Sequence, residues 1–300
     1  MKPLILPISG ILAALACHAS GAITVTSSTA SWTAISYANP NQADPSVDQQ
    51  TGGREGDIVG DASHASFYTA FDNGGTTGDL TDGEIGFRVR LAGDANPAGL
   101  KTVVWIGIDA NADGNVDLFA GALEDAKIGF YPGGDNENIS PSTTSIDSSL
   151  PYFETLTTAA NFNFSPIDAA LDPTATDFDL DDSAGGGAAS HIDHFVSFKF
   201  SLGSLVTVVN GLNLPGVNSF NENSPLRYIV ATAGQGNSLN MDLNGINGST
   251  NSATTWQALG GFTNATTPSG IAVPEPSGLA LASIASLLLG IRRRTPVVTG

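Results

Sequence analysis

The sequence predicts an all-β protein, an antiparallel β-sandwich of jelly-roll or immunoglobulin-like layout with long loops. Three observations indicate this class. Several segments alternate apolar and polar residues with a period of two, as strands do when one face is buried. Clusters of turn-forming residues separate these segments, and the chain holds 35 glycines. Only one stretch, residues 203–212, has the apolar spacing of a short helix.

Six segments are the main candidate strands. Residues 84–91 (EIGFRVRL) place four apolar side chains on one face and two arginines on the opposite face. Residues 101–109 (KTVVWIGID) are apolar on both faces, which is typical of a central strand that is covered on both sides. The other candidates are residues 127–131, 161–165, 194–202 and 226–233, with long loops expected at 132–150 and 183–190.

The two ends of the chain differ in composition from its middle. Lys2 precedes an apolar stretch and then small residues, which predicts a signal peptide over residues 1–22 and export from the cell. An N-terminal anchor, or a lipoprotein attached through Cys17, is the alternative. The predicted divisions of the remaining chain are a β-sandwich domain at 23–244, a polar linker at 245–272, a sorting tail at 273–294 and a short extension at 295–300.

The chain is strongly acidic. It has 29 Asp and Glu residues against 11 Lys and Arg residues, with a formal net charge of −18 at pH 7. Such a charge repels nucleic acid and anionic membranes, and it favours divalent cations. The single cysteine lies in the predicted leader, so the exported body has no disulfide framework. We therefore expect no nucleic-acid partner, and stability from a hydrophobic core with a structural cation.

The segment DANADGNVD is the best candidate for that cation. Oxygen-bearing side chains at every second position can converge on one ion, and a glycine at the sixth position permits the sharp reversal of a calcium loop. Its twelfth position is alanine and its flanks are predicted strands, so it is no EF-hand. A plain hairpin turn is the alternative. The predicted calcium ligands are Asp109, Asn111, Asp113, Asn115 and Asp117.

A second, weaker calcium candidate lies in TDFDLDD. In an extended chain Asp177, Asp179 and Asp181 share one face, but no glycine follows at the turn position. A solvated acidic loop is the alternative.

Two tryptophans, Trp32 and Trp256, are candidates for stacking on sugar rings, with burial as the alternative. The sequence has no G-x-S-x-G elbow and no thiol nucleophile in the exported body, and its many carboxylates define no catalytic pair. We therefore expect no catalytic residues and no enzyme activity.

The tail combines three features in a fixed order: a Pro-Glu-Pro motif, a short apolar stretch and a basic cluster. These are Pro274, Glu275, Pro276, residues 278–291, Arg292, Arg293 and Arg294. The stretch would form a helix of about 21 Å, shorter than the roughly 30 Å hydrocarbon core of a bilayer. The arginines would stay on the cytoplasmic side. A short transmembrane helix of this kind is a poor permanent anchor.

This tail resembles the PEP-CTERM sorting signal of Gram-negative bacterial proteins, and the body is similar to the Asp/Asn/Gly-rich β proteins that carry it. The resemblance implies export through the Sec and signal peptidase machinery, then a transient stay in the inner membrane. It further implies recognition and cleavage by an exosortase, and delivery to the cell surface or the extracellular matrix, often beside exopolysaccharide. The extension after the arginines departs from the pattern. A permanent C-terminal anchor without cleavage is the alternative.

The sequence therefore predicts a non-enzymatic, calcium-stabilised β-sandwich of the cell surface or extracellular matrix. A carbohydrate-binding module is the first alternative. A secreted polysaccharide or ester hydrolase is the second.

Overall fold

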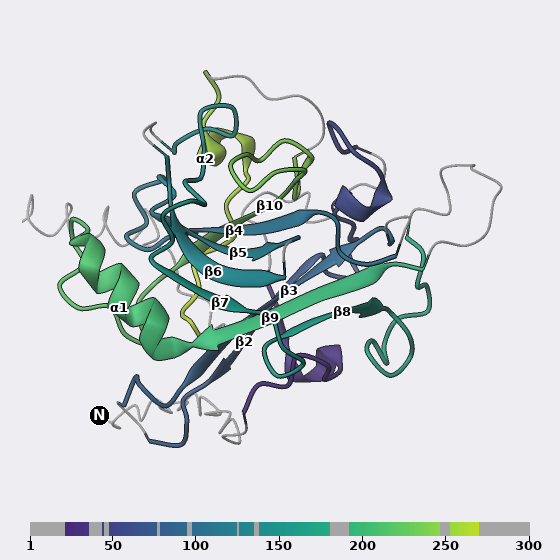
Figure 1. The fold of residues 1–300 in the computed structure, drawn as a ribbon, viewed down its shortest axis with the longest axis horizontal. Helices are drawn as coiled ribbons and strands as arrows, with labels where there is room; N and C mark the ends of the chain where they lie inside the picture. Colours follow the sequence, from purple (N-terminus) through teal and green to yellow (C-terminus); the bar gives the residue numbers. More distant parts are fainter. Residues whose placement is uncertain are drawn as a thin grey trace, which may run out of the picture.

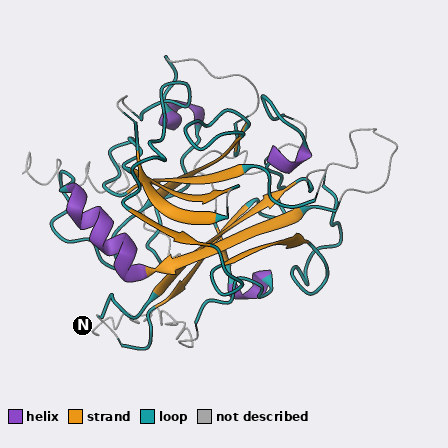
Figure 2. Cartoon of the chain, in the orientation of Figure 1, coloured by secondary structure: helices purple, strands orange, loops and turns teal. Residues whose placement is uncertain are grey.

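A computed structural model of the chain describes residues 22–35, 44, 48–76, 79–94, 98–124, 126–134, 138–180, 192–246 and 253–269. These residues form two antiparallel β-sheets with few helices, as Figure 1 and Figure 2 show. The predicted all-β class is confirmed. Apart from Ala22, the predicted leader and the predicted sorting tail lie outside the described residues. Within the described ranges, no helix combines the length and the apolar character that a membrane span requires.

The first sheet has the strand order β1-β2-β3-β9-β8. Its strands are β1 (Thr33–Ala34), β2 (Phe67–Asp72), β3 (Glu84–Leu91), β8 (Phe162–Pro166) and β9 (His194–Ser201). Strands β3 and β9 are paired along their full length near the centre of the sheet. The alternating segments of the sequence supply β3, β8 and β9, as predicted.

The second sheet has the strand order β11-β10-β4-β5-β6-β7. Its strands are β4 (Val103–Asp109), β5 (Leu118–Leu123), β6 (Lys127–Pro132), β7 (Phe153–Leu156), β10 (Arg227–Ala233) and β11 (Asp242–Leu243). Every residue of β4 is buried, which confirms the prediction of a strand covered on both faces.

Aromatic side chains from both sheets form the centre of the core. The rings of Phe67 on β2 and Phe87 on β3 approach Tyr228 on β10, with ring centroids 5.6 and 5.8 Å from that of Tyr228. Phe200 on β9 and Phe130 on β6 meet at 4.3 Å. Because each pair joins strands of different sheets, the two sheets pack face to face around one apolar layer.

The outward face of the second sheet is also buried. Trp105 and Tyr131 on this face pack beneath the C-terminal part of the described chain, which contributes Trp256 and Phe262. Trp105 fills the space above Gly121, where a Cβ would lie 2.2 Å from the indole Cζ3. Within the predicted polar linker at 245–272, Trp256 and Phe262 thus belong to this buried cluster. The few apolar residues of this segment are spaced to meet the sheet, although polar residues dominate its composition.

The outward face of the first sheet buries the two arginines of β3. The Arg88 guanidinium lies 4.2 Å from the ring centroid of Trp32 and donates to Ser197 Oγ at 2.8 Å. Arg90 donates to Asp193 Oδ2 through Nε at 2.7 Å, and its Nη2 forms an ion pair with the same oxygen at 2.7 Å. Both arginines are fully buried. Alternation correctly placed them opposite the core, but segments outside the strands cover that face too.

The helices are short and peripheral. They are η1 (Thr29–Ser31), η2 (Arg54–Gly56), α1 (Leu202–Leu212) and α2 (Trp256–Leu259). Helix α1 confirms the single helix that the sequence predicts. It begins where the Ser201 side chain accepts a hydrogen bond from the backbone N–H of Ser204 at 3.1 Å. It ends at Asn213 in the left-handed conformation.

A segment without strands joins the two sheets at one end of the sandwich. We call residues 48–60 the strap. On the side of the first sheet, the Val59 N–H donates to Arg90 O at 3.1 Å, and the Ala92 N–H donates to Asp57 O at 2.9 Å. On the side of the second sheet, the Gln50 N–H donates to Met241 O at 2.7 Å. The strap therefore holds the end of β3 beside β11.

Candidate metal centre

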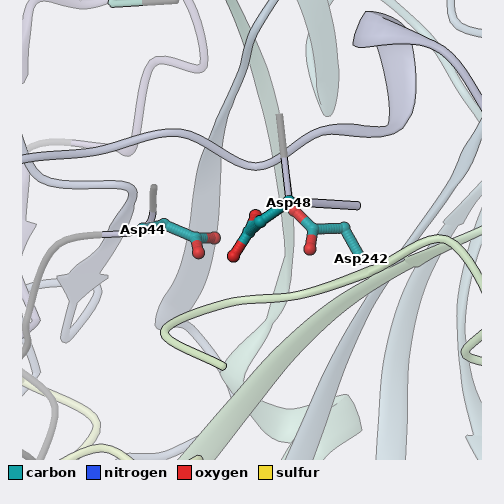
Figure 3. Close-up of side chains that lie close together, drawn as sticks. All are labelled: Asp44, Asp48 and Asp242. Carbon is teal, nitrogen blue, oxygen red and sulfur yellow. The ribbon is translucent and has the colours of Figure 1, made fainter. Parts of the chain in front are cut away.

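Three aspartates meet where the strap crosses β11. Asp48 comes from the strap, Asp242 is the first residue of β11, and Asp44 precedes the strap in the chain. One carboxylate oxygen from each lies within 4.8 Å of one from each of the others. Figure 3 shows the carboxylate of Asp48 between those of Asp44 and Asp242, with the three groups facing one another. We call these three residues the acidic cluster.

Two members of the acidic cluster are buried, Asp48 is half-buried, and the three carboxylates are only partly hydrogen-bonded. Asp44 and Asp242 are each 1% exposed. Asp44 Oδ1 accepts the Gly245 N–H at 3.1 Å, and Asp242 Oδ2 accepts the Ile58 N–H at 2.7 Å. Among the described residues, no donor reaches Asp44 Oδ2 or either carboxylate oxygen of Asp48, although all three atoms are buried. These oxygens point into the cluster and are available to a cation.

Burial and mutual repulsion raise the pKa values of all three groups. Burial raises the pKa of Asp242 to about 8, and the charges of Asp48 and Asp57 add to the effect. Burial, followed by the charge of Asp57, raises the pKa of Asp48 to about 6. The pKa of Asp44 lies well above its ordinary value for the same reasons. Buried carboxylates this close require either protons or a bound cation to compensate their charge.

The donor set of the acidic cluster is made of hard oxygens. Carboxylate ligands without imidazole or thiolate favour calcium or magnesium over zinc. Two further oxygens lie close by in the chain: the fully buried Asp57 carboxylate, and the buried amide oxygen of Gln49, which accepts no hydrogen bond from the described residues. A set of several oxygens is compatible with calcium, which takes six to eight ligands in variable geometry, and with magnesium, which requires a near-ideal octahedron.

The loop that the sequence favoured for calcium has a different arrangement. It connects β4 to β5, and its carboxylates accept hydrogen bonds from the loop itself. Asp109 Oδ2 accepts the Gly114 N–H at 3.1 Å, and Asp113 Oδ1 accepts the Asn115 N–H at 2.8 Å. Asp117 Oδ2 accepts the Ala110 N–H at 2.7 Å, which completes a hydrogen-bonded hairpin turn.

Two properties of this β4–β5 loop still bear on the calcium prediction. Burial raises the pKa of Asp117 to about 7, with Asp109 and Asp113 adding to the effect. The glycine at the sixth position, Gly114, has φ +90°, as the calcium-loop pattern requires. However, these carboxylates are not among the described groups of three that gather within 4.8 Å. Calcium binding by Asn111, Asn115 and the three aspartates stays a prediction.

The second acidic candidate packs over the buried arginines. Asp177 Oδ1 accepts the Asp179 N–H at 3.0 Å, and the carbonyl oxygen of Asp177 accepts a hydrogen bond from Arg90 at 3.3 Å. Asp179 is buried, whereas Asp177 is exposed, so the two do not share one face as an extended chain would place them. Asp181 lies outside the described residues. This segment acts as a lid over Arg90 and Asp193.

The structure buries both tryptophans proposed for sugar contact. Trp256 is 1% exposed and donates its indole N–H to Thr144 Oγ1 at 3.0 Å. Trp32 is 7% exposed, and Arg88 covers one face of its ring. The expectation of exposed stacking rings is therefore wrong. Trp256 packs on the outward face of the second sheet, and Trp32 packs on the outward face of the first sheet.

Sequence reasoning missed the acidic cluster. Asp44 and Asp48 stand in DPSVD with no turn pattern of a calcium loop, and Asp242 lies almost two hundred residues further along. Only the general excess of acidic residues pointed to a cation site. The pairing of β10 with β11 brings the two parts of the cluster together.

Comparisons with protein-family models, with curated proteins and with solved structures each find no match to this chain.

Proposed function

We propose that this chain is an exported, non-enzymatic β-sandwich protein of the cell surface or extracellular matrix, stabilised by calcium bound at the acidic cluster. The observation that carries the proposal is the set of buried carboxylate oxygens of Asp44 and Asp48 that receive no donor from the described residues. Leaving such charges uncompensated is costly, and a divalent cation removes that cost. A jelly-roll or immunoglobulin-like layout stays part of this proposal.

The extracellular setting supports calcium in particular. Sites in extracellular modules bind calcium with dissociation constants of about 10⁻⁴ to 10⁻³ M. The predicted leader and the tail that resembles a PEP-CTERM signal would bring the chain to that environment. The strong net charge of −18 also suits a hydrated surface that gathers divalent cations.

Calcium titration of the full chain tests the metal. A ligand at a hundred times its dissociation constant adds about 2.7 kcal/mol to the free energy of unfolding, which is roughly 5–10 °C in Tm for a protein of this size. We expect this rise with CaCl₂ and a smaller one with MgCl₂. Asp48→Asn should abolish the rise without removing a hydrogen bond, whereas Asp82→Asn, at an exposed aspartate before β3 that lies in neither candidate calcium site, should retain it. If EGTA and CaCl₂ give the same Tm, the metal proposal is wrong.

The sorting tail is tested separately in the native host. Replacing Pro274, Glu275 and Pro276 with alanine should leave the protein uncleaved in the inner membrane, because the motif read by an exosortase is gone. Thr295→Ala, in the extension after the arginines, is the matched control. Normal surface delivery of the triple variant would contradict sorting by this tail, and would leave the calcium proposal untouched.

A further inference from the structure

The strap has little apolar surface to hold it in place. Its first ten residues, 48–57, are polar or glycine, and only Ile58 and Val59 bring buried apolar side chains. Glycine-rich chain loses much conformational entropy when it becomes ordered. Hydrophobic burial stabilises the strands of both sheets. It therefore contributes little to the free energy that holds residues 48–57 of the strap in place.

The strap nevertheless makes the hydrogen bonds that connect the sheets at this end. Its backbone is bonded to Arg90 and Ala92 beside the first sheet, and to Met241 beside the second. Ile58 forms an isolated bridge with Leu91 of β3, while its N–H donates to the side chain of Asp242. The Asp242 carboxylate is thus both a member of the acidic cluster and a direct anchor of the strap.

Negative charge opposes this arrangement. The strap carries Asp48 and Asp57, and it lies against Asp44 and Asp242, which are buried. Each of these four carboxylates repels the others when it is ionised. A segment with few apolar side chains therefore meets four acidic side chains that repel one another, and Asp44 Oδ2 remains without a donor in the described structure.

We infer that calcium at the acidic cluster controls the closing of the strap, so that the two sheets are joined at this end only when the cation is bound. The inference rests on the proposed function, which places calcium at the same site. Without calcium the strap opens and the sheets keep their own cores. At the calcium concentration outside the cell, the strap closes and Asp242 is fixed between strap and cation. The strap would then close only after export, when the chain meets the calcium concentration outside the cell.

Hydrogen exchange on the full chain tests this inference. Exchange reports local opening amide by amide. We expect the amides of Gln50, Ile58 and Val59 to exchange about tenfold or more slowly in roughly 10 mM CaCl₂ than in EGTA, given a dissociation constant of about 10⁻³ M or below. Amides of β4 and β6, which lie inside the second sheet, should exchange at nearly the same rate in both solutions. The same experiment in MgCl₂ shows whether the strap responds to calcium specifically.

Two variants sharpen the result. Asp48→Asn removes one repelling charge and keeps the shape of the side chain, so the strap should be protected in EGTA and should no longer respond to calcium. Asp82→Asn, at an exposed aspartate outside both candidate calcium sites, should behave like the parent. Equal protection of the parent strap in EGTA and CaCl₂ overturns the inference. If calcium still raises Tm in that case, the proposed function survives. If it does not, both fail.

Discussion

Replacing Trp256 with alanine tests whether residues 253–269 belong to the core. Trp256 lies on α2, is 1% exposed and packs on the outward face of the second sheet. Its indole N–H also donates to Thr144 Oγ1. Deleting a buried indole costs about 3–5 kcal/mol through lost burial and the cavity left behind. We therefore expect Tm to fall by on the order of 10 °C for a protein of this size.

Thermal unfolding followed by circular dichroism, with calcium present throughout, measures the change. Trp256→Phe should lower the free energy of unfolding less than Trp256→Ala, because a ring still packs against the sheet. It loses mainly the hydrogen bond to Thr144, which is worth about 1 kcal/mol. Leu150→Ala is the surface control, since Leu150 is 68% exposed, and it should stay within about 0.5 kcal/mol of the parent. The reasoning is refuted if Trp256→Ala is as stable as that control.

Three further predictions follow from the packing and the charges. In EDTA, Tm should fall as pH rises from about 4 to 8, because burial raises the pKa values of two cluster carboxyls to about 6 and about 8. In this pH range the folded state holds protons that the unfolded state has already released. Stability is therefore lost as the pH rises through the pKa values of these carboxyls in the folded state. Saturating calcium should reduce this fall but not abolish it, because burial also raises the pKa values of Asp117 to about 7 and of Asp193 to about 6 outside the cluster; a Tm in EDTA that rises over the same range would contradict the prediction. Gly121→Ala should destabilise the fold by about 1–3 kcal/mol, since the new methyl collides with Trp105. Denaturant unfolding measures this loss of stability. Gly211→Ala, at an open position on α1, is the control. Asp193→Ala should cost about 3–5 kcal/mol because it leaves buried Arg90 without its closest carboxylate, and an unchanged urea midpoint would show that the ion pair is not needed.

The sequence predicted the strands whose pattern is strong, either alternating between the two faces or apolar on both. Residues 84–91 and 194–202 alternate cleanly, and they form the paired centre of the first sheet. Residues 101–109 are apolar on both faces and are buried on both. By contrast, β7 is a short edge strand in which three residues are half-buried and Leu156 is exposed, so its sequence carries no strong alternation. Its assignment depends on pairing with β6, which no local pattern reveals.

The covers of the two sheets were harder to predict than the sheets themselves. Arg88 and Arg90 alternate with apolar residues, which is typical of a solvent-facing side, yet both are buried under irregular segments. Burial of an arginine depends on distant carbonyls and carboxylates, such as Asp193, rather than on its neighbours in the chain. The acidic cluster depends in the same way on the pairing of β11, far from the strap in sequence.

The glycine beneath Trp105 has a consequence for how this face of the molecule can change over time. The indole occupies the volume that a side chain at position 121 would need. A similar contact joins Gly107 to Ile229, whose Cγ1 would lie 2.5 Å from an added Cβ. Each large side chain thus packs on a glycine of the neighbouring strand. Substituting the glycine alone produces a clash, and substituting the large residue alone leaves a cavity. In homologous chains these positions should vary as couples, with a larger residue at 121 accompanied by a smaller one at 105.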